Sequence, residues 1–478
     1  MRLLKPLAAG VFALGLLAGG AYAVAQSAAE TAVAEAIGRL RAALGPGAVV
    51  EHGAVRVEPI AGRIRLASLA IMPEGPNGER FLVADVVADN LRPGGAGFGR
   101  LSLHGTRILV GEEERGRIGS VTIEGLALPA EAGFAVADIT LDSLDVLDLA
   151  WDLPDGSALH VSYLGAGGIG GDRSDRFQIS DLVMVGSRDI GFERFELGQL
   201  EMDGVRLLPI VLATIEGRAP PVPRGASQMT VRNLLVQADG LDLVRLGELT
   251  SNAEDAEERP GTQRSMLAVR DLVIGLPHEA REALDGLEAI RIELGGRGLS
   301  DQERGDYEIE SFRLEAEGLG AIEITGRVTG APVPPLGDPM ANGRLHGLTI
   351  TFEDAGLTAR ALAGAARLSG TTEAEMRAQL RQALGELEAM LAAVPPPAPG
   401  PEPKGGAEPP LPNSKLGPQA GAPASGGRTL REFLDRPGRI TLTVQPAEPV
   451  RFADLAEALS VSGPQALFGR LGLRVQIQ

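Results

Sequence analysis

One recurring apolar pattern limits the possible folds of this chain more than any other feature. Two apolar residues two positions apart are followed by two spacer residues and then by another such pair, as in Ile64, Leu66, Leu69 and Ile71. The pattern returns in seven further segments, at 121–128, 139–146, 177–184, 195–202, 229–236, 267–274 and 307–314, with weaker matches at 81–88 and 101–108.

Alternation with a period of two predicts a β-strand with one apolar face. A two-residue spacer turns the second half of such a strand to the opposite face, unless the chain bends or bulges there. The spacers contain residues that bulges and turns prefer, among them Gly125, Asp181, Asn233 and Asp271. Each unit is therefore predicted to be a bent strand with one buried face, or two very short strands.

The resulting fold class is mainly β, with some helix (α+β). We expect an elongated antiparallel sheet of short repeated strands that can curl into a groove, with an N-terminal anchor helix and C-terminal helices. Ordinary β-sandwich domains are the alternative. A chain of 478 residues is too long for one compact core, so it predicts two or three domains or one extended array.

Residues 1–29 have the layout of a signal anchor or a signal peptide. Arg2 and Lys5 precede the apolar segment 7–25, and no charged residue occurs between 6 and 29. The uncharged run is long enough to cross a bilayer as a helix, and we favour an anchor in the inner membrane for this reason. Cleavage after Ala23 or Ala25, which would release a soluble periplasmic protein, is the alternative.

The rest of the chain divides by composition. The predicted parts are an amphipathic stem helix at 30–47, the repeated-strand region at 48–355, a helical segment at 356–394, a disordered Pro/Gly/Ala-rich linker at 395–428 and a small strand–helix segment at 429–478. Thr372 and Glu375 have the spacing of a capping box and predict the start of a helix.

Composition argues against several kinds of chemistry. The net charge of −18 repels phosphate backbones, and aromatic residues make up only 3% of the chain, so nucleic acid is not an expected partner. The chain has no Cys, which excludes disulfides, thiolate metal sites and Cys nucleophiles.

Four motifs can be compared with functional ones. Residues 165–170 match G-x-G-x-x-G, but a strand rather than the required helix is predicted next, so we interpret them as a glycine-rich hairpin loop. The other three motifs have the features of surface or strand positions. They are the tripeptide 304–306 (Arg-Gly-Asp), the five isolated histidines His52, His104, His160, His278 and His346, and an acidic run around Trp151 that consists of Asp142, Asp145, Asp148, Asp152 and Asp155. We predict no catalytic, cofactor-binding or metal-binding residue. Carboxylate pairs that only the fold brings together, as in glycosidases, stay open.

The anchor-like segment 7–25 and the repeated strand units together resemble the AsmA/TamB-like and YdgA-like envelope proteins. Segments 348–358 and 436–442 add to this resemblance. The resemblance implies a periplasmic protein, attached to the inner membrane by one helix, whose sheet handles lipid or other apolar cargo. The Pro-rich insert and the low aromatic content depart from that pattern.

Two functions follow as hypotheses for a non-enzymatic envelope protein. The first is binding or conducting lipid or other apolar cargo on the apolar face of the strands. The second is a structural or assembly role, in which the sheet edges bind other envelope proteins by strand addition.

Overall fold

The structure is a computed structural model of the whole chain. It describes the following residues: 33–34, 37–38, 41, 47–58, 62–73, 78–91, 98–126, 140–153, 155–169, 176–186, 191–205, 225–257, 259, 261–301, 304–331, 342–392, 429–455 and 470–478. The predicted anchor at 1–29 and the predicted linker at 395–428 lie outside these residues. No helix in the described ranges has the length and apolar character needed to span a bilayer.

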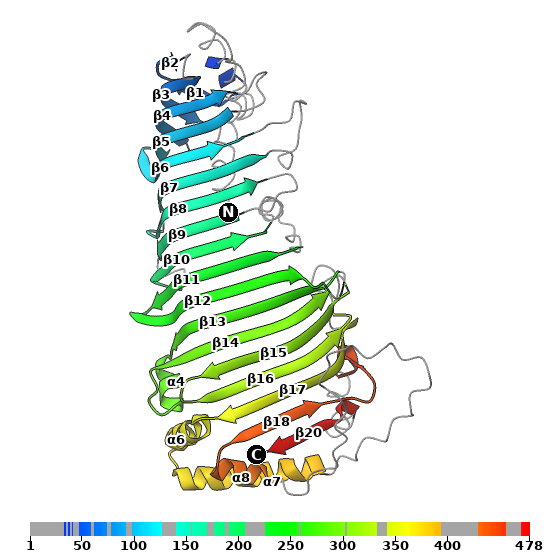
Figure 1. Cartoon of the computed structure of the whole chain (residues 1–478). Helices are drawn as coiled ribbons and strands as arrows, with labels where there is room; N and C mark the ends of the chain where they lie inside the picture. Colours follow the sequence, from blue (N-terminus) through cyan, green and yellow to red (C-terminus); the bar gives the residue numbers. More distant parts are fainter. Residues whose placement is uncertain are drawn as a thin grey trace. The chain divides into compact units, whose positions relative to one another are not determined.

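The described chain is mainly β, as predicted, and forms two compact units (Figure 1). Unit 1 is Met1–Asn252 and unit 2 is Ala253–Gln478. Strand β12 (Leu241–Asp255) contains the division between them.

Unit 1 contains one antiparallel sheet in which the strands from β3 onward pair with the next strand along the chain. Its strands are β1 (Val49–His52), β2 (Val55–Glu58), β3 (Arg63–Met72), β4 (Glu79–Leu91), β5 (Phe98–Val110), β6 (Glu113–Glu124), β7 (Leu141–Asp152), β8 (Ala158–Ile169), β9 (Arg176–Val185), β10 (Arg194–Asp203) and β11 (Ser227–Ala238). β1 and β2 both pair with β3, and β3 to β11 pair in sequence order. The strands of this unit therefore form one row rather than the two packed sheets of a sandwich.

A line of bent residues crosses this sheet at one level, and we call it the crease. On alternate strands the residue at this level has a positive φ: Ser68, Gly105, Asp148, Asp181 and Asn233. This conformation costs energy for every residue except glycine. The intervening strands oppose them with small residues: Ala84, Gly119, Ser162 and Gly198. Because every strand bends at the same level, the pairing register runs through the crease without a shift. The predicted bent strand is confirmed at β3, β9 and β11.

Unit 2 achieves the same bend by β-bulges. Its strands are β13 (Gln263–Gly275), β14 (Ala289–Asp301), β15 (Asp306–Ala316), β16 (Gly320–Thr329), β17 (Arg344–Asp354), β18 (Arg439–Val444), β19 (Val450–Arg451) and β20 (Leu473–Ile477). The register shifts between Val269 and Leu272 on β13, and between Ile309 and Phe312 on β15. An extra residue on one strand keeps the apolar side chains on one face while the neighbouring strand alternates regularly. The predicted bulge is thus confirmed in β13 and β15.

Helices also accompany the strands of unit 2, among them α4 (His278–Ala283), α6 (Leu357–Ser369), α7 (Glu373–Ala392) and α8 (Leu430–Asp435). The capping box is confirmed, since the Glu375 amide donates to Thr372 Oγ1 at 3.2 Å and the Thr372 amide donates to Glu375 Oε2 at 2.9 Å. The bond from the Thr372 amide, followed by one of 2.9 Å that the Thr372 hydroxyl donates to the same carboxylate oxygen, lowers the pKa of Glu375. Helix α4 lies within the stretch 48–355 that was predicted to be the repeated-strand region.

Helix α8 covers one end of the sheet of unit 2. Phe433 of α8 packs against Phe352 of β17, with ring centroids 6.5 Å apart. Helix α6 passes close to α4, because Gly364 leaves room for the backbone of Ala283, whose carbonyl oxygen would lie 1.8 Å from an added Cβ. In this unit, α8 packs on β17 and α6 packs on α4.

Candidate functional site

The candidate site is one face of the sheet of unit 1, which we call the apolar face. Its side chains form four rows that cross strands β3 to β11, two on each side of the crease. The rows run from Ile71 to Val236, from Leu69 to Leu234, from Leu66 to Val231 and from Ile64 to Met229. The third row consists of Leu66, Val86, Leu103, Val121, Val146, Leu164, Ile179, Leu200 and Val231. Thr106 and Gly116 are the two positions in the four rows without an apolar side chain.

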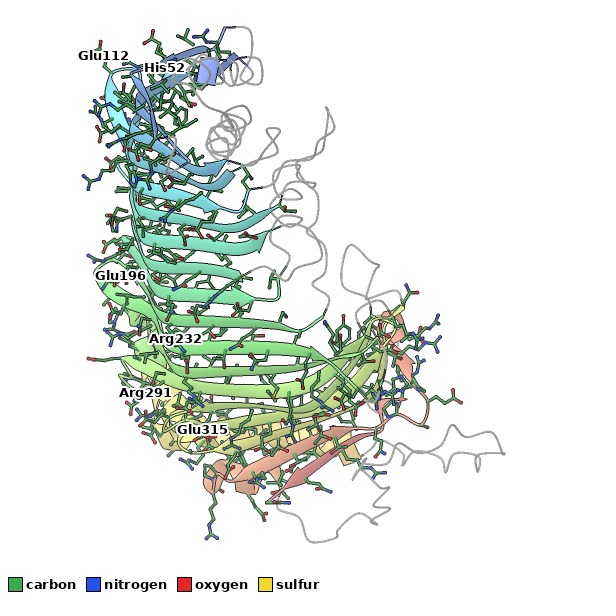
Figure 2. All side chains as sticks on the ribbon, turned by 45° about the horizontal axis from the view of Figure 1, so that its top comes forward. His52, Glu112, Glu196, Arg232, Arg291 and Glu315 are labelled. Atoms are coloured by element: carbon green, nitrogen blue, oxygen red, sulfur yellow. The ribbon has the colours of Figure 1, made fainter. Side chains whose placement is uncertain are left out.

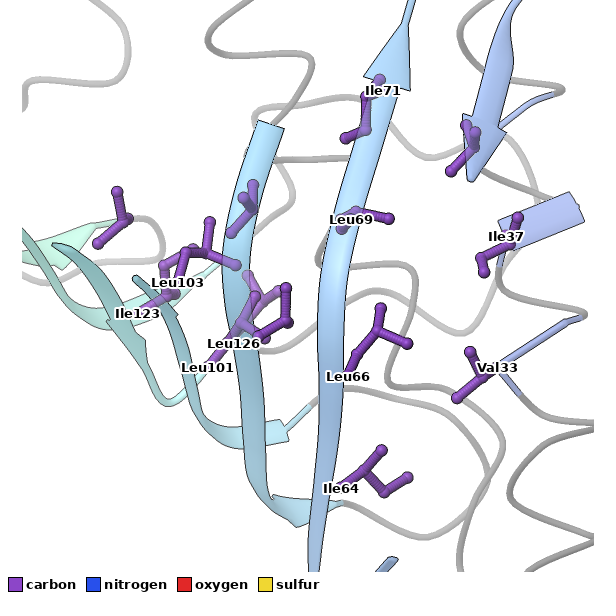
Figure 3. Packing of buried hydrophobic residues seen from close by; sticks show 14 of the residues in the cluster. Val33, Ile37, Ile64, Leu66, Leu69, Ile71, Leu101, Leu103, Ile123 and Leu126 are labelled. Carbon is purple, nitrogen blue, oxygen red and sulfur yellow. The ribbon is translucent and has the colours of Figure 1, made fainter. Parts of the chain in front are cut away.

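At the β3–β6 end, the apolar face is the core of unit 1. Leu69 and Leu101 are each 1% exposed. They belong to one cluster with the helical residues Val33 and Ile37 and with Val50 of β1. Figure 3 shows Val33 and Ile37 beside Leu66 and Leu69 of β3. Both halves of the bent strands contribute to this cluster, which confirms that the bend keeps both halves on one face.

Further along the sheet, the side chains of the same rows are less deeply buried. On β8 to β11 most of their side chains are only partly buried, among them Phe177, Ile179, Leu200 and Val231. Among the described elements, β8, β9 and β10 make extensive contact only with their neighbours in the sheet. A continuous apolar surface on a folded protein is typical of a site that binds something apolar.

The opposite face of the sheet is polar. Arg65 Nε lies 2.7 Å from Asp85 Oδ1, and Arg232 donates to Glu248 Oε1 at 3.0 Å and to Gln199 Oε1 at 3.0 Å. Figure 2 shows the side chains of both faces on the ribbon, with Glu196 and Arg232 labelled. Such exposed pairs contribute little stability, on the order of 0–1 kcal/mol each. They make the opposite face more polar than the apolar face, although Leu82, Leu147, Val183 and Leu235 also lie on it.

A tyrosine and an aspartate on neighbouring strands form a hydrogen bond on the polar face. Tyr163 Oη donates a hydrogen bond of 2.7 Å to Asp145 Oδ1. This hydrogen bond, together with partial burial, raises the pKa of Tyr163. The ring of Tyr163 lies over Gly165, where an added Cβ would be 2.2 Å from Oη. Asp145, one of the residues of the predicted acidic run, is therefore a hydrogen-bond acceptor within the sheet.

The glycine-rich sequence is a strand rather than a hairpin loop. Strand β8 continues through Gly165 and Gly167 to Ile169, and these glycines pair with Gln178 and Arg176 of β9. The prediction of a loop was wrong because the ladders on both sides compensate for the weak strand preference of glycine. The next described element is strand β9, so no described helix follows to hold a pyrophosphate.

The other motif residues are dispersed. His52, His104 and His160 lie on exposed strand positions, and His278 begins helix α4. His346 is partly buried on β17, with Nε2 2.7 Å from Thr329 Oγ1. Within the ranges that the structure describes, no three His, Asp or Glu side chains are placed to hold a metal ion.

The remaining motifs also have structural roles. Residues 304–306 form the turn into β15, where the Gly305 amide donates to the Asp301 carbonyl at 2.8 Å. Asp155 caps a turn by accepting from the Ser157 amide at 3.0 Å. Residues 304–306 and Asp155 thus take part in the hydrogen bonds of two turns.

Sequence reasoning found most of the bent strands and missed three. The matches at 121–128 and 139–146 straddle the ends of β6 and β7, whose bends lie instead at Gly119 and Asp148. The true units are 116–123, 144–151 and, on β8, 159–166. Gly116 and Ala166 disguise the pattern because they are small. Admitting Gly and Ala at the apolar positions would have found the units on β6 and β8, whereas the unit on β7 already has large apolar residues at all four positions and overlaps the match at 139–146.

Comparisons with known proteins give one match. A family model described as "Uncharacterized protein" matches residues 313–402 and 406–478, which is less than half of the chain and lies within unit 2. No curated protein matches the chain. No solved structure matches it either. The chain is thus similar, over its C-terminal part, to that uncharacterized family.

Proposed function

We propose that this protein is a non-catalytic component of the cell envelope that binds lipid acyl chains on the apolar face of unit 1, along β7 to β11. The observation that supports the proposal is the continuity of the four rows beyond the core at β3–β6 onto strands where no described helix covers them. The same side-chain chemistry that forms a core at one end is partly exposed to water at the other.

The energetics favour an apolar ligand. Full burial of a Leu, Ile, Phe or Met side chain contributes about 1.5–3 kcal/mol. Each side chain on β8 to β11 that is only partly buried has realised only part of this free energy. The rows supply many such side chains next to one another, and further burial would add the remaining part. An acyl chain lying on them recovers that part without requiring a hydrogen-bond partner, since the rows there contain no polar side chain.

The proposed location follows from the sequence alone. The positive leader and the uncharged segment 7–25 support export to the periplasm and attachment to the inner membrane through one N-terminal helix. Release as a soluble periplasmic protein after cleavage is the alternative form of the same proposal.

The test is labelling of the full-length protein, in detergent, with a fatty acid that carries a photoactivatable diazirine. We expect the label on peptides of β8 to β11, at residues of the four rows. Ile179→Glu should reduce this labelling strongly, because an ionised side chain on the face must be desolvated when the acyl chain binds. Gln178→Glu is the matched control, since Gln178 precedes Ile179 on β9 and lies on the opposite face.

Two results would contradict the proposal: no labelling of β8 to β11 above the background of other surface peptides, or equal labelling of the two variants. Lipid analysis of the purified full-length protein provides an independent readout. A chain that retains no lipid after mild extraction and gains none on incubation does not bind acyl chains.

The second candidate function is binding of other envelope proteins by strand addition. Strand β20 pairs with β18 along one edge and with no other strand in the described ranges. An unpaired strand edge presents backbone donors and acceptors to a partner strand. Replacing Val475 by Pro removes one of those donors, and it should abolish crosslinking to a specific envelope protein if this edge is the binding site.

A further inference from the structure

The helical residues Val33 and Ile37 occupy the β3–β5 end of the apolar face. Val33 is 6% exposed and Ile37 is 4% exposed, and both belong to the cluster that contains Leu66, Leu69 and Leu103. Figure 3 shows them on the side of β3 that carries Leu66 and Leu69. Because they are four residues apart in a helix, they lie on the same helix face and can cover neighbouring strands together.

A third residue of the same helical stripe fixes this position. Arg41, four residues after Ile37, donates a hydrogen bond of 2.6 Å from its guanidinium to the carbonyl oxygen of Val50 on β1. Val50 itself is 1% exposed and belongs to the same cluster. Residues 33, 37 and 41, which we call the stem residues, thus attach to the sheet through apolar packing and through one charge-assisted hydrogen bond.

The burial of the apolar face changes along the sheet, although the kind of side chain on it stays the same. The third row is buried at Leu66, Val86, Leu103 and Val121, and it is partly exposed at Val146, Leu164, Ile179, Leu200 and Val231. Leu, Val and Ile supply both parts, so the side chains do not account for the difference. Among the described residues, Val33, Ile37 and Leu126 join the cluster at the buried end.

We propose that the stem residues are a built-in plug that occupies the β3–β5 end of the apolar face and confines bound acyl chains to β7–β11. The proposal rests on the proposed function for the ligand, but not for the cover itself. It assigns a role to residues just after the predicted anchor: they close the face at the end nearest to the chain's N-terminus. An acyl chain can extend past β6 only when the stem residues leave the sheet.

The first experiment is the diazirine labelling described above, on the full-length protein and on a Val33→Ser/Ile37→Ser variant. In the unchanged protein we expect labelled peptides from β8 to β11 and background labelling of β3 to β5. In the variant, labelling of β3 to β5 should rise to the level found on β8 to β11. Arg41→Ala, which leaves the apolar contacts in place, should give an intermediate rise.

The second experiment detects the cover without any lipid. Because the chain has no Cys, Leu69→Cys introduces a unique thiol beneath the stem residues. We expect this thiol to react slowly with N-ethylmaleimide in the unchanged background and rapidly with Val33→Ser/Ile37→Ser added. Leu200→Cys on the open part of the face should react at the same rate in both backgrounds, and this shows that the variant keeps its fold there.

The outcomes separate the two proposals. Labelling of β3 to β5 in the unchanged protein overturns the plug. The plug is also overturned if Val33→Ser/Ile37→Ser leaves the reaction rate of Leu69→Cys unchanged while the rate of Leu200→Cys is the same in both backgrounds. Absence of labelling anywhere overturns lipid binding and with it the confinement of acyl chains, while the maleimide rates still decide whether the stem residues cover the face. If Val33→Ser/Ile37→Ser also changes the reaction rate of Leu200→Cys, the maleimide experiment is repeated in the Arg41→Ala background. The rates of Leu69→Cys and Leu200→Cys in that background then decide whether the stem residues cover the face.

Discussion

Gly198 of β10 lies directly opposite Asn233 of β11 at the crease, so close that an added Cβ would be 2.9 Å from Cβ of Asn233. Asn233 has a φ of 54° there, and Asp181, with a φ of 51°, lies at the same level of β9 on the other side of Gly198. A left-handed residue therefore flanks the glycine on each side. The missing side chain is what lets the three strands bend at one level.

The first prediction follows from this contact. Gly198→Ala should lower the free energy of unfolding by about 1–3 kcal/mol, because the new methyl group overpacks the crease. Gly167→Ala on β8 is the matched control. Its added Cβ would lie 3.5 Å from the nearest atom, the carbonyl oxygen of Asp142, so its effect should be small. Urea unfolding curves of both variants provide the measurement, and equal midpoints for the two would refute the overpacking.

The second prediction concerns the left-handed residue on β9. Asp181→Val should destabilise unit 1 by about 1–2 kcal/mol, because a β-branched residue tolerates a positive φ poorly. Asp181→Gly should change the free energy of unfolding by less than about 1 kcal/mol, because glycine adopts this conformation without steric cost. Gln178→Val, which introduces the same side chain elsewhere on β9, controls for loss of polarity. A Gly variant as unstable as the Val variant would mean that the carboxylate, and not the backbone, matters at this position.

The third prediction concerns the hydrogen bond between Tyr163 and Asp145. Asp145→Ala removes the first cause of the raised pKa of Tyr163, so that pKa should fall toward its ordinary value of 10.0. The stability contributed by the hydrogen bond is fully present below pH 10 and is lost as the pH rises through the raised pKa. Ultraviolet absorbance of tyrosinate provides the measurement, in a Tyr22→Phe/Tyr307→Phe background that removes the other two tyrosines of the sequence. An unchanged titration of Tyr163 would show that burial alone sets the pKa.

The fourth prediction is a pH dependence of unit 2. Burial, followed by the positive charge of Arg327, lowers the pKa of His346 below 6.5. The unfolded chain therefore binds a proton more readily than the folded one, so the stability of unit 2 should decrease as the pH falls below 6.5.

Hydrogen exchange of the β17 amides reports this change locally. With His346→Gln, the loss of protection between neutral pH and the onset of carboxylate titration should become smaller. His278→Gln is the control, because the side chain of His278 is 83% exposed and lies in α4. The same acid-induced loss of protection in both variants would remove His346 as its cause.

The candidate site shows which inferences a single sequence permits. The two-spacer pattern predicted bent strands with one apolar face, and Ser68, Asp181 and Asn233 adopt the left-handed conformation at the second spacer position. It placed the bends of β6 and β7 wrongly and missed β8. Gly116 on β6 and Ala166 on β8 are small and hide the periodicity of those two strands. On β7 the periodicity allows two overlapping units, 139–146 and 144–151, and the pairing of β7 with β6 selects the second.

Local chemistry in the sequence determined the strands with one apolar face, the helix that begins after the Thr372–Glu375 capping box and the absence of thiol chemistry. These features depend on residues at most a few positions apart. The tertiary structure alone decided that the four rows align across nine strands, that Gly198 lies between Asp181 and Asn233, and that Val33 and Ile37 pack in one cluster with Leu66 and Leu69 while most row residues of β8 to β11 are only partly buried. Such features depend on pairing between residues far apart in the chain, and pairing is settled by which apolar surfaces can be buried together.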